Sequence, residues 1–360
     1  MPPRLIEMLK IDHPIIQAPM AGVSTPRLAA AVSNAGALGS ISVGASDAVA
    51  AKKSMVETRE LTDRPFNVNV FCHQPAKANT KIENYWIQYL KPYFEEFDST
   101  PPPALREIYR AFGHDSAMLQ ALIDERPAVV SFHFGLPPQN YIKALKQAGI
   151  VLIATATSVE EGEQIANAGV HAIVAQGIEA GGHRGMFNPQ LGDPGIPTLE
   201  LVQALTSQID LPVIAAGGIM EGDGISRALA AGAQAAQLGT AFVLCPESSA
   251  NEGYRHRLKA VKPGGTQITA AISGRPARGI INRMHREIGA SNAPTLPDYP
   301  MAYDAAKTLH AAASANGCHD FAAHWAGQGA HRARAMPASA LVAALVSEIQ
   351  PSAAGFDKTC

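Results

Sequence analysis

The chain has 360 residues, of which 47% are hydrophobic and 17% are charged, and its formal net charge is -2 at pH 7. It lacks the basic stripe of a nucleic-acid-binding protein, and no apolar run reaches the length of a membrane span. Arg4, Glu7 and Lys10 interrupt the opening segment where a secretory signal would be continuously apolar, so we expect a cytoplasmic protein.

Eight short apolar runs alternate with helical patterns, which indicates βα units and a parallel sheet. The predicted strands cover residues 14–20, 38–43, 66–71, 128–134, 150–157, 172–177, 212–218 and 235–242. Several of the intervening helices end in Ala-Gly, where glycine accepts the left-handed conformation of a helix C-terminus. Eight such units predict an α/β protein with a closed (β/α)8 TIM barrel, with an open doubly wound sheet as the alternative.

Two segments interrupt this repeat. Residues 73–125 are too long for one crossover after the third strand, and residues 246–332 follow the eighth strand with a helical appearance. We assign residues 1–72, 113–245 and 333–360 to a cofactor-binding barrel, closed by a final helix within SALVAALVSEI. We assign residues 73–112 and 246–332 to a smaller, mainly helical domain that covers the barrel mouth and the substrate.

Glycines follow the last two predicted strands, at Gly217-Gly218 and at Gly239-Thr240. Many barrels bind a phosphate there through backbone N–H groups, so we favour a phosphate-bearing cofactor over simple tight turns. No GxGxxG motif follows a strand, which argues against a nicotinamide cofactor on a Rossmann motif.

Metal binding is not expected. The four cysteines show no CxxC spacing, and there is no HExxH motif. His319 and His324 lack the i, i+4 spacing that would direct both rings at one ion, so we expect them on the surface.

The segment GIEAGGHRG, residues 177–185, follows the sixth strand at the catalytic end of the barrel. Gly181 and Gly182 would let a flat ring such as a flavin touch the backbone, with His183 reaching the substrate above it. The alternative is a turn with a surface histidine. His133 ends the fourth strand, where it either lines the barrel mouth or is a core histidine.

Tyr299, Tyr303 and Lys307 follow one another at i, i+4 spacing, which places them on one face of a helix. Two hydroxyls and an ammonium group would suit a small anion such as a carboxylate or a nitronate. A solvated helix face is the alternative.

In combination these segments resemble the nitronate monooxygenase family, also called 2-nitropropane dioxygenases, which are FMN-dependent (β/α)8 barrels. The resemblance covers nearly the whole chain, through PIIQAPMAGVSTPRLAAAVSNAGALGSI, FNVNVF, SFHFGLP, AQGIEAGGHRG and PVIAAGGIMEGDGISRALAAGAQAAQLGTAFVLCPES. SFHFGLP and SGRPARGIINR (273–283) are similar to the branch that oxidises nitronates without NAD(P)H.

The resemblance implies His183 and His133 as catalytic residues. It implies that the substrate is bound by Tyr109, Tyr299, Tyr303 and Lys307. It implies that FMN is bound by Met20, Gly22, Asn69, Gln176, Gly181, Gly182, Gly217, Gly218, Gln237, Leu238, Gly239 and Thr240.

The implied reaction is the detoxifying oxidation of propionate 3-nitronate and alkyl nitronates by O2 to a carbonyl compound and nitrite. The expected partners are therefore small molecules, and we also expect a homodimer. The AGGH block occurs as well in NAD(P)H-dependent quinone and enoyl reductases, so a reductase on the same flavin barrel is the alternative function.

Overall fold

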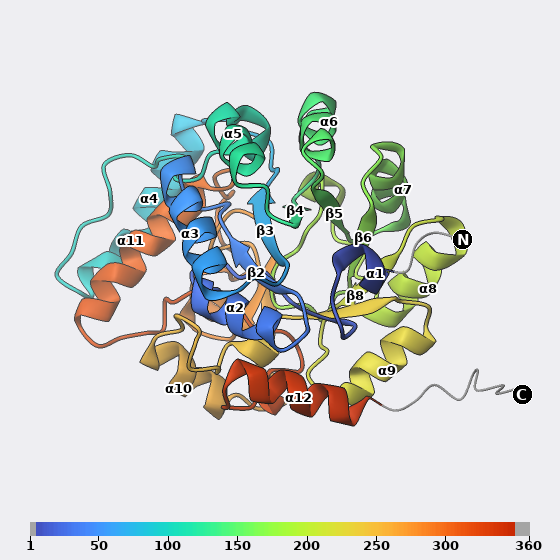
Figure 1. Cartoon of the computed structure of the whole chain (residues 1–360). Helices are drawn as coiled ribbons and strands as arrows, with labels where there is room; N and C mark the ends of the chain where they lie inside the picture. The colour runs from blue at the N-terminus through green and yellow to red at the C-terminus, as the bar shows by residue number, and fades with distance from the viewer. Residues whose placement is uncertain (1–4, 350–360) are drawn as a thin grey trace, which may run out of the picture.

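The computed structural model describes residues 5–349 of the chain. The outer ends of the assigned barrel ranges and Cys360 therefore lie outside the described residues. Eight parallel strands form one sheet (Figure 1): β1 (Ile15–Gln17), β2 (Gly39–Ser42), β3 (Phe66–Phe71), β4 (Val129–His133), β5 (Val151–Ala156), β6 (Ala172–Gln176), β8 (Val213–Ala216) and β9 (Ala235–Leu238).

The sheet is closed. Its strand order is β1-β9-β8-β6-β5-β4-β3-β2, and the two end strands meet through the backbone. Gln17 N–H donates to the Leu38 carbonyl at 2.9 Å, and Leu38 N–H donates to the Ile15 carbonyl at 3.0 Å. The predicted (β/α)8 barrel is thereby confirmed over the open sheet.

A ring of helices surrounds the barrel (Figure 1): α2 (Pro26–Asn34), α3 (Ala48–Leu61), α5 (Ser116–Glu125), α6 (Gln139–Gln147), α7 (Val159–Asn167), α8 (Thr198–Gln208), α9 (Gly222–Ala230) and α12 (Ala338–Glu348). The short helix α1 (Leu5–Leu9) packs its leucines on side chains inside one end of the barrel. The glycines of the Ala-Gly pairs have the positive φ that their position predicted, at Gly36, Gly149, Gly169 and Gly232.

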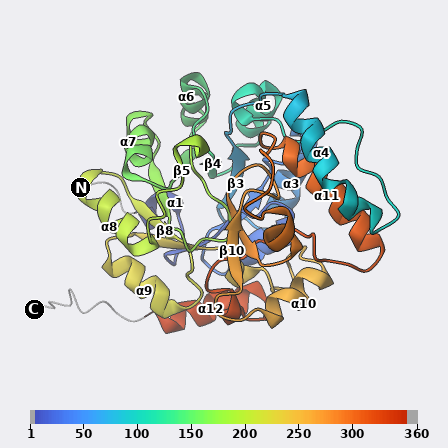
Figure 2. The ribbon, with the colours of Figure 1, turned by 180° about the vertical axis from the view of Figure 1, so that it is seen from behind.

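A second hydrophobic cluster lies outside the barrel. It joins Trp86 and Phe94 of α4 (Thr80–Glu95) to Leu309 of α11 (Met301–Ala315) and to Phe321. Both views show α4 and α11 side by side (Figures 1 and 2). The segments 73–112 and 246–332, which we assigned to one covering domain, therefore share a core.

The covering segment also contains a small sheet that its helical appearance did not predict. Strands β10 (Thr266–Thr269) and β11 (Ala277–Ile280) pair antiparallel, and β11 pairs in turn with β7 (Gly182–His183). In Figure 2, β10 faces the viewer on the side opposite α1. The pairing fixes the backbone of the glycine-rich segment at its histidine. The segment 246–332 also holds α10 (Glu252–Ala260).

Within residues 5–349, no helix combines the length and the apolar character that crossing a membrane requires.

Candidate active site

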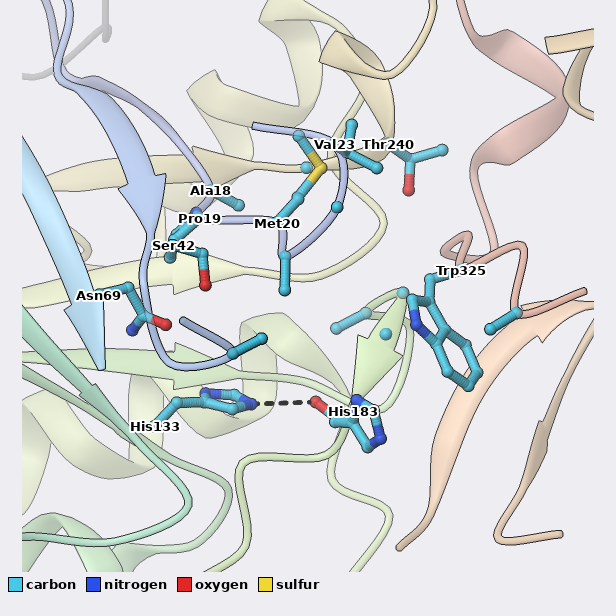
Figure 3. A pocket seen from close by; sticks show the side chains of 18 of the residues that line it. Ala18, Pro19, Met20, Val23, Ser42, Asn69, His133, His183, Thr240 and Trp325 are labelled. Carbon is cyan, nitrogen blue, oxygen red and sulfur yellow. Dashed lines mark hydrogen bonds between the residues drawn. The ribbon is translucent and has the colours of Figure 1, made fainter. Parts of the chain in front are cut away.

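A cavity of about 660 Å³ lies where the barrel strands end and the covering segments begin (Figure 3). Every residue predicted for the site lines this cavity except Leu238, whose side chain packs into the barrel core. The cavity thus gathers His133, His183, Tyr109, Tyr299, Tyr303, Lys307, Met20, Gly22, Asn69, Gln176, Gly181, Gly182, Gly217, Gly218, Gln237, Gly239 and Thr240.

His183 lies at the centre of the site. Its Nε2 is 2.8 Å from Ser273 Oγ, and its ring packs among Phe134, Tyr299 and Trp325 with centroid distances of 5.6, 5.6 and 5.1 Å. Desolvation, together with the nearby positive charge of Arg275 and two neighbouring histidines, lowers the pKa of His183 to about 3. The imidazole is therefore neutral at physiological pH.

Two side chains hold the backbone of His183. Its carbonyl oxygen accepts hydrogen bonds from Gln176 Nε2 at 3.0 Å and from His133 Nε2 at 3.2 Å (Figure 3). Because this carbonyl can only accept, His133 carries its proton on Nε2, and its Nδ1 accepts from Thr155 Oγ1 at 3.2 Å. Burial lowers the pKa of His133 to about 4. Both ring nitrogens of His133 thus serve to position His183.

Gly181 and Gly182, which precede His183, are required by the packing and the conformation of the backbone. A Cβ atom at Gly181 would lie 2.5 Å from the backbone N of Gly327 and 2.6 Å from the carbonyl carbon of Ala326. We expected these glycines to admit a flat ring, yet the close neighbour of Gly181 is the chain's own backbone. Gly182 has a φ of 75°, which favours glycine for a different reason.

Arg184 holds the same segment in place through hydrogen bonds. Its side chain is fully buried, and its Nε donates to Asp193 Oδ2 at 2.6 Å. Its Nη1 also donates to the Gln176 and Gly177 carbonyls at 3.0 and 2.7 Å and to Gln176 Oε1 at 3.0 Å. Gln176 thereby joins the barrel strand to the histidine loop through both atoms of its amide.

The cavity wall also contains a cation next to two phenol rings. Lys307 Nζ lies 5.3 Å from the ring centroid of Tyr109 and 5.2 Å from that of Tyr303. Lys307 forms no ion pair with any residue in the described range 5–349. Burial raises the pKa of Tyr109 and of Tyr303 to about 12, so both hydroxyls remain donors.

The predicted helical stripe is only partly correct. Tyr303 and Lys307 lie on α11, but the helix begins at Met301, so Tyr299 precedes it. Tyr299 is nevertheless at the site, because its ring packs against those of His183 and Phe134 at 5.6 and 5.4 Å.

Another part of the cavity wall has the groups that a flat polar ring with an attached phosphate would need. Ser42 Oγ is buried there without a hydrogen-bond partner in the described part of the chain, and Asn69 is anchored beside it by Ser131 Oγ at 3.0 Å (Figure 3). Gly217 and Gly218 have φ values of 134° and 68°, which only glycine adopts readily. Their backbone lines the cavity with that of Gly239 and Thr240, as a phosphate site of a barrel requires.

Sequence reasoning missed Trp325, which lines the cavity, and Ser273, which does not line it but contacts His183. Trp325 and Ser273 contact His183 from segments far along the chain, and no local pattern signals such contacts. The expectation of a surface position was wrong for His324, which is 5% exposed and stacks on Tyr254 at a centroid distance of 4.7 Å. Among residues 5–349, no group of three or more His, Cys, Asp or Glu side chains could hold a metal ion.

The chain forms a closed (β/α)8 barrel with a histidine-containing cavity at the C-terminal ends of its strands. Enzymes of this fold have their active sites at that position. Residues 2–348 match the family model of nitronate monooxygenase. The chain is 54% identical over 347 residues to a nitronate monooxygenase of Pseudomonas aeruginosa, which covers 96% of this chain and 99% of the relative. It therefore belongs to the nitronate monooxygenase family, as the resemblance implied, and is a flavin-dependent oxidoreductase.

Two solved structures resemble the barrel and its covering segments. Nitroalkane oxidase from Streptomyces ansochromogenes has a TM-score of 0.87 and 39% identity, covering 96% of this chain and 97% of that chain. FabK from Thermotoga maritima has a TM-score of 0.73 and 30% identity, covering 96% of this chain and 95% of that chain.

Proposed function

We propose that this protein is an FMN-dependent nitronate monooxygenase that oxidises propionate 3-nitronate and alkyl nitronates with O2 to a carbonyl compound and nitrite, a detoxifying reaction. This proposal rests on the presence, in one cavity, of a neutral His183 and of Lys307, which forms no ion pair within residues 5–349. A small molecule that bears a nitronate at one end and a carboxylate at the other would meet both groups.

FMN would be held along the wall formed by Ser42 and Asn69 and at the glycine backbone of residues 217–218 and 239–240. When bound, the flavin supplies the redox chemistry that no amino-acid side chain can supply.

The chain's own residues bind and orient the substrate. Lys307, whose ammonium group lies next to the Tyr109 and Tyr303 rings, would pair with the carboxylate of the substrate. His183 would hydrogen-bond the nitronate oxygens as a neutral donor. The aromatic rings of Phe134, Tyr299 and Trp325 around His183 exclude water from the reacting end.

The test is nitrite release from propionate 3-nitronate in air, without NADH, by the purified flavin-loaded protein. We expect His183→Asn to lower kcat at least about 100-fold, because it removes a group that contacts the reacting atoms, while the flavin stays bound. The matched control is His256→Asn, an exposed histidine on α10, which should retain full activity. Full activity of His183→Asn would remove His183 from the mechanism.

The alternative is an NAD(P)H-dependent quinone or enoyl reductase on the same barrel. Its support is weaker, because FabK is 30% identical to this chain while the Pseudomonas aeruginosa nitronate monooxygenase is 54% identical. Oxidation of NADH by a quinone, with no nitrite formed from any nitronate, would favour the reductase.

A further inference from the structure

Ser273 is a fully buried residue that contacts His183 from the turn between β10 and β11. Its Oγ lies 2.8 Å from His183 Nε2 and 3.1 Å from the Arg275 carbonyl oxygen, and it accepts the Arg275 backbone N–H at 3.2 Å. The turn is fixed in place by Gly274, where a Cβ atom would lie 2.6 Å from the Pro297 carbonyl oxygen.

The two nitrogens of the His183 ring have different surroundings. Nε2 faces Ser273, whereas Nδ1 has no hydrogen-bond partner among residues 5–349 and is not buried. Since His183 lines the cavity, Nδ1 is the nitrogen that a bound molecule can reach. A neutral imidazole has one N–H, so the nitrogen that carries the proton decides whether Nδ1 donates or accepts.

The Ser273 hydroxyl has one hydrogen and two acceptors within reach. The contact with His183 Nε2 is the shorter one, and an imidazole nitrogen is a stronger base than a backbone carbonyl oxygen. A hydroxyl that donates to Nε2 requires Nε2 to be unprotonated, which places the ring proton on Nδ1.

We propose that Ser273 is a positioning residue that donates to His183 Nε2 and so keeps the imidazole proton on Nδ1, where it hydrogen-bonds the anionic end of the substrate. The chemistry of the substrate rests on the function proposed above, because only an anion requires a donor at this atom. The opposite tautomer would direct a lone pair of Nδ1 at the nitronate oxygens and repel them.

The first test is nitrogen NMR of the histidine side chains in the wild-type holoenzyme saturated with nitrate, a planar and redox-inert anion that resembles the nitronate group. His183 is assigned from the signal that is missing in His183→Asn. The expected result is a neutral ring with its proton on Nδ1. A proton on Nε2 would overturn the proposal, whatever the enzyme is found to oxidise.

The second test compares three variants by the same spectrum and by kcat/KM for propionate 3-nitronate. Ser273→Ala should change the His183 tautomer and lower kcat/KM by about tenfold or more, since it leaves Nε2 without its donor. Ser273→Thr keeps the hydroxyl and should restore the Nδ1 proton.

The control is Ser33→Ala, because Ser33 is also buried and its hydroxyl also accepts a backbone N–H, but its own hydrogen goes to the Pro65 carbonyl, far from the site. This variant should leave both readouts unchanged. An unchanged tautomer in Ser273→Ala would overturn the assignment. A wild-type enzyme with the Nδ1 proton but no nitrite formation would instead contradict only the proposed function.

Discussion

Lys307 is an exposed cation in the cavity wall. Its ammonium group lies 5.3 Å from the ring centroid of Tyr109 and 5.2 Å from that of Tyr303, and it forms no ion pair with another residue of the described range. An anionic ligand could bind this ammonium group without breaking an existing ion pair, and such a contact would distinguish a carboxylated nitronate from an alkyl one.

We expect Lys307→Met to raise KM for propionate 3-nitronate by about tenfold, because a charge-assisted hydrogen bond is lost. KM for ethylnitronate, which has no carboxylate, should change less than about twofold. Lys53→Met, on the exposed face of α3, is the control for the loss of one positive charge. Equal effects of Lys307→Met on both substrates in steady-state assays would rule out the carboxylate contact.

Residues next to a strand or a glycine motif could be predicted from the sequence, and distant contacts could not. His183 and Asn69 were identifiable because each lies near the end of a strand, and the topology of a barrel brings those ends together. Ser273 and Trp325 enter the site through the antiparallel pairing of β7 with β11 and through the segment that packs on Gly181. Nothing in the local sequence around either residue specifies those partners.

At the scale of elements, the loop that carries His183 depends on a buried ion pair. Arg184 is fully buried and its partner Asp193 is 17% exposed, so the arginine charge is compensated mainly by that carboxylate. The neighbouring charge and the hydrogen bonds from Arg184 lower the pKa of Asp193 despite its burial, so the carboxylate stays ionised.

Asp193→Ala should lower the free energy of unfolding by about 3 kcal/mol, because it leaves a buried charge without a counter-ion. Asp223→Ala breaks an ion pair with Arg227 on the exposed face of α9 and should cost less than about 1 kcal/mol. Urea denaturation of both variants checks the difference. Similar losses in the two variants would mean that the buried pair contributes no more than a surface pair.

The barrel elements followed from the sequence more completely than the covering elements did. A barrel strand is a continuous apolar run between helices, and the eight runs predicted here match the eight strands. The strands β10 and β11 have only four residues each. Their sequences, TQIT and ARGI, mix polar and apolar residues without a regular period. Short strands of this kind are specified by their partners rather than by their own pattern.

At the scale of the whole molecule, burial of histidines links stability to pH. Desolvation lowers the pKa of His73, His133 and His285 to about 4 and that of His183 and His324 to about 3. In the unfolded chain these rings titrate near pH 6.5. Between these values the unfolded chain binds protons that the folded chain does not bind.

Stability should therefore be fully present above pH 6.5 and should fall as the pH decreases from 6.5 toward 4. Each fully neutral buried histidine contributes a slope of up to about 1.4 kcal/mol per pH unit. Because most carboxylates remain ionised above pH 5, thermal unfolding between pH 7.5 and pH 5 isolates the histidines. A Tm that stays constant or rises on acidification over this range would contradict the assignment of neutral buried rings.

The cytoplasmic location and the homodimer remain predictions. The proposed function depends on which compound reduces the bound flavin. The most direct measurement is the visible spectrum of the purified holoenzyme, mixed without oxygen first with NADH and then with propionate 3-nitronate. We predict that NADH leaves the flavin oxidised, that the nitronate bleaches it, and that nitrite appears when air is admitted. Prompt bleaching by NADH and no response to the nitronate would contradict the proposed function and identify a reductase on the same barrel.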